Sequence, residues 1–344
     1  MYRPTPVRGA KSGAALIPTE SKGGGSNTET KTPSVHAIVV THRGADILPA
    51  CLRALEAEAR RTAASVEIVV VDNASTDATE SILRADFPEV TALRLPENAG
   101  YGRANNVALR RALAAGADFG ALVNDDVEVR AGWLSALLQA ATLHPEAGLL
   151  NGTLLFRGED RVNSTGLVID RLGRARDRDF GTPLATLRRE EGPVEGASGG
   201  AMLVRSALLL RIGVFDPAYF AYYEDVDLSL RARRAGSICW YVPGAVADHR
   251  FASTVGAGSA RQRYLLGRGH LRTLALHQPA FRAAALVPLT AAFRLAVKSP
   301  LELLRGRPDL AAAEARAGID GARAALLALP VRIRAGIPRG AEPR

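Results

Sequence analysis

Three carboxylates stand within four positions at the end of an aromatic segment. Glu224, Asp225 and Asp227 directly follow the run FDPAYFAYY and precede a basic helical pattern. Carboxylates are seldom buried without a partner or a chemical task, so this segment is a candidate for acid–base chemistry. A carboxylate that takes the proton of an attacking hydroxyl typically accelerates a reaction ~10²–10⁴-fold. We take Asp225 as the candidate base and Glu224 as its supporting neighbour, whereas Asp227 can equally be a helix N-terminal acid that the macrodipole favours.

A second acidic cluster, LVNDDVEV, lies upstream at 122–129. In it Asn124 to Asp126 follow an apolar strand directly, and a carboxylate at a strand end can hold Mg²⁺ or Mn²⁺ for a diphosphate group. His249 stands after another predicted strand and turn, and its neutral imidazole could complete a metal shell begun by Asp126. The competing interpretations are an Asx-capped turn and an ordinary surface histidine. The position after the fourth strand of a nucleotide-type sheet favours the metal.

Strands and helices alternate through the first part of the ordered chain. The predicted strands are 35–40, 66–72, 90–95 and 119–123. Short connections between such elements imply a parallel, doubly wound α/β sheet, in which ligands bind beyond the carboxyl ends of the strands. After about residue 130 the pattern changes to mixed strand, hairpin and helix material.

Polar residues cluster at the carboxyl ends of the first strands. Thr41 and Arg43 follow the first strand, and Asp72 and Asn73 follow the second. Asp72 could accept a hydrogen bond from a pyrimidine ring N–H or a ribose hydroxyl, although capping of the next helix is an open alternative. The turn NAGYG at 98–102 precedes a helix whose free N–H groups could face a phosphate. Convergence of several clusters on one edge of the sheet favours a nucleotide site more than any one cluster does.

The composition is that of an ordinary globular protein, with 47% hydrophobic and 23% charged residues over 344 positions. The length permits one large domain with an appendage, or two domains. Cys51 and Cys239 lie in apolar patterns and are interpreted as core thiols, which fits a reducing cytosol. We expect no secretory signal and no segment with the ~20 uninterrupted apolar residues of a membrane span. The nearest segment, 283–297, contains Pro288 and Arg294 and is interpreted as an interfacial or buried helix.

Basic charge gathers at both ends of the chain. Residues 1–34 carry 5 Lys and Arg against 2 Asp and Glu, and residues 261–344 carry 15 against 5. Such asymmetry suggests an anionic partner surface, either nucleic acid or membrane lipid. The Ala- and Leu-rich C-terminal part lacks interleaved aromatics and any nucleic-acid motif, so we expect membrane lipid and no nucleic acid. We predict a disordered basic tail over 1–34, a catalytic domain over 35–260 and a basic helical, membrane-associated region over 261–344.

Five blocks of the sequence form an ordered series. They are VHAIVVTHRGADILPACLRAL, EIVVVDNASTDATESIL, LPENAGYGRANNVAL, LVNDDVEV, and EGASGGAMLVR with its continuation to YYEDVDLSLRARRAG. Over about 35–255 the chain resembles the family 2 glycosyltransferases, most closely the bacterial rhamnosyltransferase-like branch. The resemblance implies the GT-A fold, a Rossmann-like mixed sheet flanked by helices that binds nucleotide-diphospho-sugars. A C-terminal helical appendage would follow it here.

The resemblance also implies roles for individual residues. Asp225 resembles the catalytic base, and Asp126 with His249 resembles the ligands of a divalent metal, Mg²⁺ or Mn²⁺. Asn124 stands where many members have Asp, which leaves one carboxylate fewer beside the metal. The positions that resemble nucleotide-sugar contacts are Thr41, Arg43, Asp72, Asn73, Asn98, Gly100, Arg103, Asn124 and Asp125.

These assignments imply an inverting, metal-dependent hexosyltransferase. A single base implies a single displacement with inversion at the anomeric carbon, and the metal would stabilise the departing diphosphate. The implied donor is a dTDP- or UDP-sugar, with rhamnose leading, and the implied acceptor is a cell-envelope glycan or a polyprenyl-linked glycan. We expect the protein in the cytoplasm, peripheral at the inner face of the cell membrane. Sugar rings stack on aromatic faces, so an acceptor wall is expected from Tyr219, Phe220, Tyr222 and Tyr223.

Two other functions are open alternatives. A nucleotidyltransferase also uses a nucleotide sheet and a carboxylate-bound metal, but the segment THRG at 41–44 is a poor version of the basic Gly-rich signature expected there. A non-catalytic nucleotide- or glycan-binding relative is the other alternative, and the presence of Glu224, Asp225 and His249 argues against it.

Overall fold

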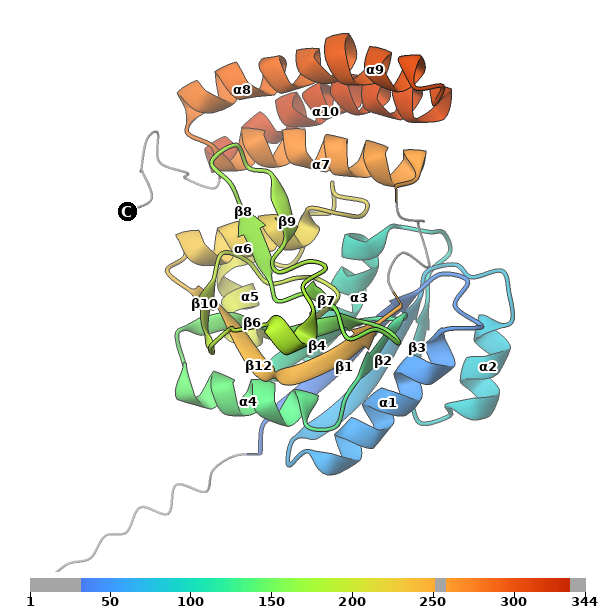
Figure 1. The fold of residues 1–344 in the computed structure, drawn as a ribbon. Helices are drawn as coiled ribbons and strands as arrows, with labels where there is room; N and C mark the ends of the chain where they lie inside the picture. The colour runs from blue at the N-terminus through green and yellow to red at the C-terminus, as the bar shows by residue number, and fades with distance from the viewer. Residues whose placement is uncertain (1–31, 251–257, 335–344) are drawn as a thin grey trace, which may run out of the picture. The chain divides into compact units, whose positions relative to one another are not determined.

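A mixed β-sheet with helices on both of its faces is the centre of the fold (Figure 1). The computed structural model describes residues 32–250 and 258–334, so residues 1–31 of the predicted tail lie outside the described residues. The described chain from Thr32 onward belongs to one unit. The predicted boundary between a catalytic domain over 35–260 and a C-terminal region over 261–344 falls within that unit. This division stays a prediction.

The first half of the sheet is parallel, as the alternation of strands and helices predicted. Its elements are β1 Ser34–Thr41, α1 Leu48–Arg61, β2 Ser65–Asp72, α2 Thr79–Asp86, β3 Thr91–Arg94, α3 Tyr101–Ala114 and β4 Phe119–Asn124. The strand order is β3-β2-β1-β4. Thr41 lies opposite Asp72 in β2, and Val40 lies opposite Asn124 in β4. The carboxyl ends of β1, β2 and β4 therefore meet at one edge of the sheet.

The second half of the sheet mixes parallel and antiparallel pairs. Its elements are β5 Val127–Val129, α4 Trp133–Leu143, β6 Ala147–Phe156, β7 Val162–Ser164, β8 Leu167–Ile169, β9 Ala175–Asp177, the short 3₁₀ turn Leu184–Thr186, β10 Gly192–Val194, β11 Ala201–Arg205, α5 Ser206–Ile212, α6 Glu224–Arg234 and β12 Ile238–His249. Strand β11 runs antiparallel between β4 and β6, and β12 pairs in parallel with β6. The end of β12 pairs with β5, so that His249 lies opposite Val127. This pairing brings His249 next to Asp126, although strands β5 to β11 lie between the two residues in the chain.

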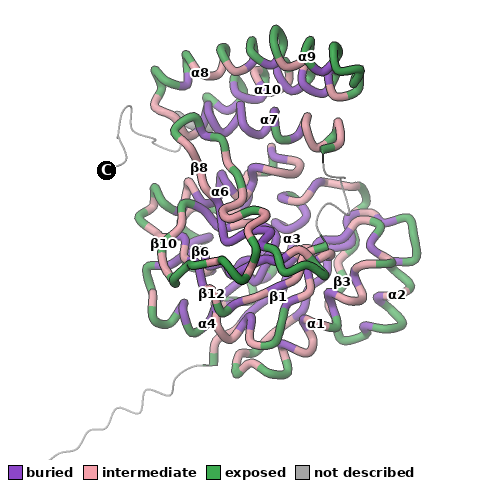
Figure 2. Tube along the Cα trace, in the orientation of Figure 1, coloured by how far each residue is buried: buried purple, intermediate pink, exposed green. Residues whose placement is uncertain are grey.

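The core lies on both faces of the sheet (Figure 2). Successive residues of β1 point to opposite faces, so Val39 packs in the cluster that includes Leu52 of α1, and Ile38 packs in the cluster that includes Leu109 of α3. Burial on both faces explains why the strands are continuous apolar runs. Both cysteines are buried and unpaired, as predicted.

A C-terminal group of helices follows β12, which confirms the expected helical appendage. Its members are α7 Ala260–His277, α8 Ala280–Phe293, the π-helical turn Arg294–Lys298, α9 Ser299–Leu304 and α10 Pro308–Arg334. Helix α7 contacts the segment that precedes α6. Arg272 forms an ion pair with Asp216 at 2.6 Å, and the Tyr219 hydroxyl lies 2.7 Å from Thr273 Oγ1.

Among the described residues, one helical segment is long and apolar enough to be a candidate membrane span. The chain is helical without a break over Ala280–Leu304, 25 residues that by length and composition alone could cross a bilayer. The stretch 283–297, which the sequence predicts to be an interfacial or buried helix, lies within this segment, where Pro288 and Arg294 interrupt the apolar run but not the helix. Arg294 is buried, so its charge does not reach the outer surface of the helix.

Asp227 holds α6 against α7. Its carboxylate forms an ion pair with Arg231 at 2.8 Å and a hydrogen bond with His277 Nε2 at 2.7 Å. Burial acts to raise the pKa of Asp227, but Arg231 and His277 outweigh burial and lower it to about 2. Burial lowers the pKa of His277, so the neutral ring donates its Nε2–H to the carboxylate. Of the two interpretations of Asp227, this geometry supports the structural one.

We predict that Asp227→Asn lowers the free energy of unfolding by about 3 kcal/mol, because Arg231 and His277 would face an uncharged amide in a buried site. A folded pKa lowered to about 2 from 3.8 means that the carboxylate stabilises the fold above about pH 4. This contribution is lost as the pH falls from about 4 toward 2. Urea unfolding followed by circular dichroism at several pH values measures both effects.

The control for this prediction is Glu80→Gln, which removes exposed ion pairs with Arg84 and Arg94. Such pairs contribute about 0.5 kcal/mol or less. Equal losses in the two variants would contradict the assignment of Asp227 as a buried anchor.

Candidate active site

A cavity of about 350 Å³ lies at the carboxyl ends of β1, β2 and β4. This is where ligands bind in open α/β sheets, and the volume is within the ordinary range of small-molecule sites. Most of the predicted site residues line it: Asn73, Asn98, Gly100, Asn124, Asp125, Asp126, Glu224, Asp225 and His249. The clusters that the sequence placed at separate strand ends therefore share one cavity.

Thr41, Arg43, Asp72 and Arg103 are not among the residues that line this cavity. Thr41 reaches it indirectly, because its hydroxyl donates a hydrogen bond to Asp125 Oδ2 at 2.7 Å. Burial raises the pKa of Asp125 to about 7; the nearby Asp126 also raises it, while the Thr41 hydrogen bond opposes the shift. Contact of these four residues with a donor stays a prediction.

Asp72 is buried at the end of β2, where its carboxylate has hydrogen-bond partners within the protein. Its carboxylate accepts hydrogen bonds from Arg94 at 2.6 Å and from the Ser75 backbone N–H at 2.8 Å. The Arg43 backbone N–H donates to Ser75 Oγ at 2.9 Å, and Arg43 has a positive φ of 59°. Asp72 therefore does not cap α2, whose N-cap is Ala78 with no side-chain cap bond, but it closes the turn that follows β2.

The NAGYG turn is held in place by two amide side chains. Asn98 Oδ1 accepts from Asn73 Nδ2 at 3.1 Å and from the Gly100 N–H at 3.0 Å. Gly100 has a φ of 83°, and a Cβ atom there would lie 2.3 Å from the Phe220 carbonyl oxygen. That same oxygen accepts the Tyr101 N–H at 2.7 Å. Glycine is therefore required where the turn meets the aromatic segment.

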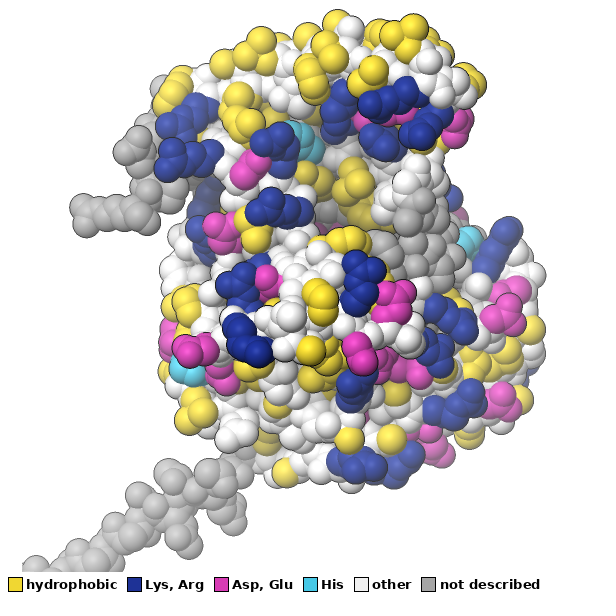
Figure 3. Space-filling view, viewed as in Figure 1, with side chains coloured by type: hydrophobic (Ala, Val, Ile, Leu, Met, Phe, Trp, Pro, Cys, Tyr) yellow, Lys and Arg dark blue, Asp and Glu magenta, His cyan; other side chains and the backbone are white. Residues whose placement is uncertain are grey.

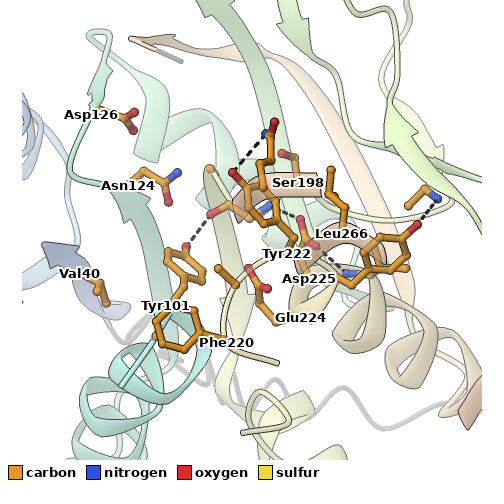
Figure 4. Close-up of a pocket in the computed structure, with 18 of the residues that line it drawn as sticks. Val40, Tyr101, Asn124, Asp126, Ser198, Phe220, Tyr222, Glu224, Asp225 and Leu266 are labelled. Atoms are coloured by element: carbon orange, nitrogen blue, oxygen red, sulfur yellow. Dashed lines mark hydrogen bonds between the residues drawn. The ribbon is translucent and has the colours of Figure 1, made fainter. Parts of the chain in front are cut away.

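Glu224 and Asp225 begin α6 and face the cavity from the side opposite Asn124 and Asp126 (Figure 4). Asp225 Oδ2 accepts the Gly199 N–H at 3.0 Å, and Oδ1 accepts the Val226 N–H at 2.8 Å. Burial raises the pKa of Asp225, and these two donors oppose that rise.

Glu224 lies deeper than Asp225 and has fewer partners. Burial and the neighbouring Asp225 raise the pKa of Glu224. Its Oε2 atom is buried without a hydrogen-bond partner among the described residues. Two adjacent carboxylates in a site of low polarity do not ionise together readily. Glu224 therefore holds the proton, and Asp225, with its two N–H donors, carries the negative charge.

Asp126 and His249 form a pair at the ends of β4 and β12. The distance between His249 Nε2 and Asp126 Oδ1 is 3.2 Å, and His249 Nδ1 lies 2.8 Å from Asn163 Oδ1. An amide oxygen can only accept, so Nδ1 is the ring atom that donates to Asn163, and Nε2 is the ring atom that faces Asp126. In metal-bound histidines, the ring nitrogen that does not bind the metal usually donates its N–H to a nearby oxygen, as Nδ1 does here. The donor set fits a divalent cation that also binds phosphate oxygens.

The described residues contain no group of three or more His, Cys, Asp and Glu side chains that could hold a metal. The pair of Asp126 and His249 is thus too small to enclose an ion by itself. A Mg²⁺ or Mn²⁺ site of this kind is completed by substrate phosphates and water, as is usual for these cations.

Three buried polar atoms on the cavity wall have no hydrogen-bond partner among the described residues. They are Asn124 Oδ1, Asn163 Nδ2 and Glu224 Oε2. More than ~90% of buried polar groups are paired in folded proteins. Three exceptions on one cavity indicate that a polar ligand completes this site.

Asp177 is a cavity residue that the sequence analysis missed. It ends β9, in the hairpin that β8 and β9 form, and its carboxylate is buried. Burial raises the pKa of Asp177 to about 6; hydrogen bonds from Ser164 and Ser198 lower it, and the Asp225 charge raises it. In the sequence Asp177 stands in a run of alternating Arg and Asp, which is typical of an exposed surface, so no local signal marked it.

Tyr219, one of the four residues of the predicted aromatic wall, lies outside the cavity lining. Phe220, Tyr222 and Tyr223 line the cavity, but Tyr219 does not. Tyr219 is 1% exposed and its hydroxyl pairs with Thr273 in α7. The expectation for Tyr219 is therefore wrong, because its ring is buried and its hydroxyl is taken up by α7.

Helix α7 supplies part of the cavity wall, which the sequence analysis did not predict. Arg261, Gln262 and Leu266 line the cavity. The Arg261 guanidinium lies 5.4 Å from the centre of the Phe220 ring, and Gln262 Nε2 donates to the Tyr222 hydroxyl at 3.2 Å. The C-terminal helices are thus joined to the site itself.

The sequence of this chain is similar to a described family and to individual proteins. Residues 36–210 match the family described as Glycosyl transferase family 2. N-acetylglucosaminyl-diphospho-decaprenol L-rhamnosyltransferase of Mycobacterium tuberculosis is 32% identical over 215 residues, which cover 57% of this chain and 70% of that protein. Rhamnosyltransferase WbbL of Escherichia coli is 45% identical over 56 residues, or 16% of this chain and 21% of that protein.

Solved structures share the fold at low sequence identity. The mannosyltransferase PcManGT from Pyrobaculum calidifontis, solved with GDP-Man and Mn²⁺, has a TM-score of 0.51 at 19% identity, over 85% of this chain and 88% of that one. GalNAc-T7, solved with UDP, GalNAc and Mn²⁺, has a TM-score of 0.59 at 12% identity, over 91% of this chain and 59% of that one. These likenesses establish the GT-A type of mixed sheet.

We predict that Glu224→Gln becomes more stable than the native protein as the pH rises. A raised folded pKa means that the folded state keeps a proton that the unfolded chain releases near its usual pKa of 4.5. Native stability is therefore lost as the pH rises from about 4.5 toward the raised pKa, whereas a glutamine has no proton to lose. Thermal unfolding at pH values between about 5 and 8 measures the difference.

The melting temperature of Glu224→Gln minus that of the native protein should increase across this range. Glu97→Gln, at an exposed position outside the cavity, serves as the control and should show a constant difference. A constant or falling difference for Glu224→Gln would show that Glu224 is ionised in the fold.

Proposed function

The chain belongs to glycosyl transferase family 2 and is a glycosyltransferase, and on that premise we propose that it transfers a sugar from a nucleotide-diphosphate donor to a glycan hydroxyl with inversion. The observation that carries this proposal is the presence of two separate acidic groups on one cavity: Asp126 with His249, and Glu224 with Asp225. A cation-binding pair and a separate base are what a single displacement needs.

Asp225 is the proposed base. It stays charged because the N–H groups of Gly199 and Val226 stabilise its carboxylate, whereas Glu224 keeps its proton. In the transfer step the acceptor oxygen forms a bond to the anomeric carbon while the bond from that carbon to the diphosphate oxygen breaks. Asp225 takes the acceptor proton in this step. Attack opposite the leaving group gives inversion.

Asp126 and His249 are the proposed metal ligands. A divalent Mg²⁺ or Mn²⁺ held there would neutralise the charge that develops on the leaving nucleoside diphosphate. The orientation of His249 by Asn163 supports this assignment, and so do the Mn²⁺ ions named with PcManGT and GalNAc-T7.

The proposed donor site lies along the ends of β1, β2 and β4. Its members are Thr41, Arg43, Asp72, Asn73, Asn98, Gly100, Arg103, Asn124 and Asp125. The unpaired Asn124 Oδ1 atom supports a polar ligand at this place. We propose a dTDP- or UDP-sugar, with rhamnose or a related hexose, because the two relatives named above are rhamnosyltransferases.

The proposed acceptor is a cell-envelope glycan or one carried on a polyprenyl diphosphate. The decaprenol named for the mycobacterial relative supports a lipid-linked acceptor. Such an acceptor places the enzyme in the cytoplasm at the inner face of the cell membrane, with 35–260 as the catalytic domain. The basic charge of 261–344 supports an anionic surface next to this domain.

A donor screen tests the function. Purified protein is incubated with dTDP-, UDP- and GDP-sugars and a lipid-linked GlcNAc acceptor analogue, and release of the nucleoside diphosphate is measured with Mn²⁺, with Mg²⁺ and with EDTA. We expect release from a dTDP- or UDP-sugar that depends on both the acceptor and the cation. Release from none of the donors would contradict the proposed function.

We predict that Asp225→Asn lowers kcat with the active donor ~10²–10⁴-fold, because the amide cannot accept the acceptor proton. Donor affinity, measured by isothermal titration calorimetry, should change by less than about threefold. The control is Asp86→Asn, at an exposed position at the end of α2 outside the cavity. Retention of native turnover in Asp225→Asn would refute the assignment of the base.

A further inference from the structure

The helical segment Ala280–Leu304 has its polarity inverted. From Ala284 to Leu304 every exposed residue is Ala, Pro, Leu, Phe or Val. Two of the three charged residues of the same stretch are buried, since Arg294 is 8% exposed and Glu302 is 5% exposed, and the half-buried Lys298 faces Glu314 at 3.8 Å. A helix on the surface of a protein in water normally has the opposite arrangement.

Ion pairs lock the inward side of this segment to the rest of the helical group. Arg294 donates to Glu314 of α10, which is fully buried and also lies 3.3 Å from Arg263 of α7. Gly267 makes this close approach possible, because a Cβ atom there would lie 2.4 Å from Arg294 Nη1. An orientation that spans a bilayer would place these charges at the level of the hydrocarbon. The inward charges therefore favour a segment that lies flat on a surface.

The outward side is a large apolar face. Figure 3 shows hydrophobic side chains along α8 and α9, with a band of Lys and Arg beside them. The large exposed side chains of the segment are Phe281, Leu289, Phe293, Leu295, Val297, Leu301, Leu303 and Leu304, and we call this set the outer face. Contiguous apolar patches of this kind on soluble proteins mark contacts with another protein or with a membrane.

The charges around the outer face identify which of these it contacts. Exposed arginines stand at the ends of the segment, at Arg282 and at Arg305, and on the exposed side of α10 at Arg316 and Arg323. Of the four carboxylates between 280 and 329, Glu302 and Glu314 are buried, Asp320 is half-buried, and Asp309 alone is exposed. Apolar side chains flanked by arginines are typical of helices that lie in the interface of an anionic bilayer. A two-fold contact with a second copy would bring the same arginines together, which disfavours self-association.

We propose that the outer face lies in the plane of an anionic lipid bilayer, with its Leu and Phe side chains at the boundary between headgroups and acyl chains. Arg282, Arg305, Arg316 and Arg323 contact the lipid phosphates. The bilayer is then one helix away from the cavity, because α7 packs on α10 and also supplies Arg261 to the cavity wall. This surface adds to the proposed function the place where a lipid-linked acceptor would arrive.

Vesicle flotation with the full-length protein tests this proposal. Vesicles of phosphatidylcholine alone are compared with vesicles that also contain phosphatidylglycerol. The native protein should float with the anionic vesicles only. Leu289→Gln with Leu304→Gln, at positions 65% and 86% exposed, should lower the partition coefficient more than about tenfold. Arg316→Gln with Arg323→Gln should lower it about tenfold or more.

The matched control is Leu143→Gln with Leu210→Gln, at positions 66% and 73% exposed in α4 and α5. It should float as the native protein does. Equal flotation of both leucine pairs, or no flotation of the native protein, would overturn the proposal. If the native protein is a dimer that Leu289→Gln with Leu304→Gln makes monomeric, the outer face binds a second copy and the lipid proposal is likewise overturned.

A second measurement guards against a variant that fails to fold. Phe293→Trp should shift its fluorescence to shorter wavelength when anionic vesicles are added, and Leu210→Trp should not. No shift in Phe293→Trp contradicts the proposal. Neither readout needs a donor or an acceptor, so failure of this proposal is distinguishable from failure of the proposed function.

Discussion

The site depends on keeping several carboxylates buried at the start of α6, and the structure accommodates each of them differently. Asp225 accepts two backbone N–H groups, one of them from Gly199. Glu224 keeps its proton because burial and Asp225 raise its pKa. Asp227 stays charged because Arg231 and His277 lower its pKa. Three neighbouring acids therefore have three different sets of partners. Only one of them, Asp225, has both a charge and access to the cavity, which is what a base requires.

This arrangement joins parts of the chain that are far apart in sequence. The Tyr101 hydroxyl of α3 donates to the Gly199 carbonyl at 2.7 Å, so the loop that supplies an N–H to Asp225 is itself held by the start of α3. On the other side, His277 ties α6 to α7. Helix α7 in turn packs against α10 and the segment Ala280–Leu304. The cavity wall, α6 and the C-terminal helices are thus connected by direct contacts. A contact made at the outer face is therefore close to the cavity.

Much of the fold could be predicted from local patterns, because buried parallel strands are continuous apolar runs and end at polar residues. This applies to Asp72 and to the cluster from Asn124 to Asp126. What could not be predicted depends on long-range packing or on backbone conformation. Asp177 enters the cavity only because β8 and β9 fold back as a hairpin. Tyr219 and Tyr222 look alike in sequence, and only their partners in α7 distinguish them, since Tyr219 pairs with Thr273 in the core and Tyr222 pairs with Gln262 on the cavity wall. The inverted polarity of Ala280–Leu304 appears only when the inward partners are known.

The most direct test of the central claim is the anomeric configuration of the product. A single ionised carboxylate, Asp225, that takes the acceptor proton leads to one displacement at the anomeric carbon. Proton NMR of the product formed from the active nucleotide sugar measures that configuration through the coupling of the anomeric proton or, for a manno-configured sugar, through the one-bond carbon–proton coupling. The predicted result is a glycosidic bond of configuration opposite to that of the donor. A product with the donor's configuration would contradict Asp225 as the single base and would require a different mechanism in this cavity.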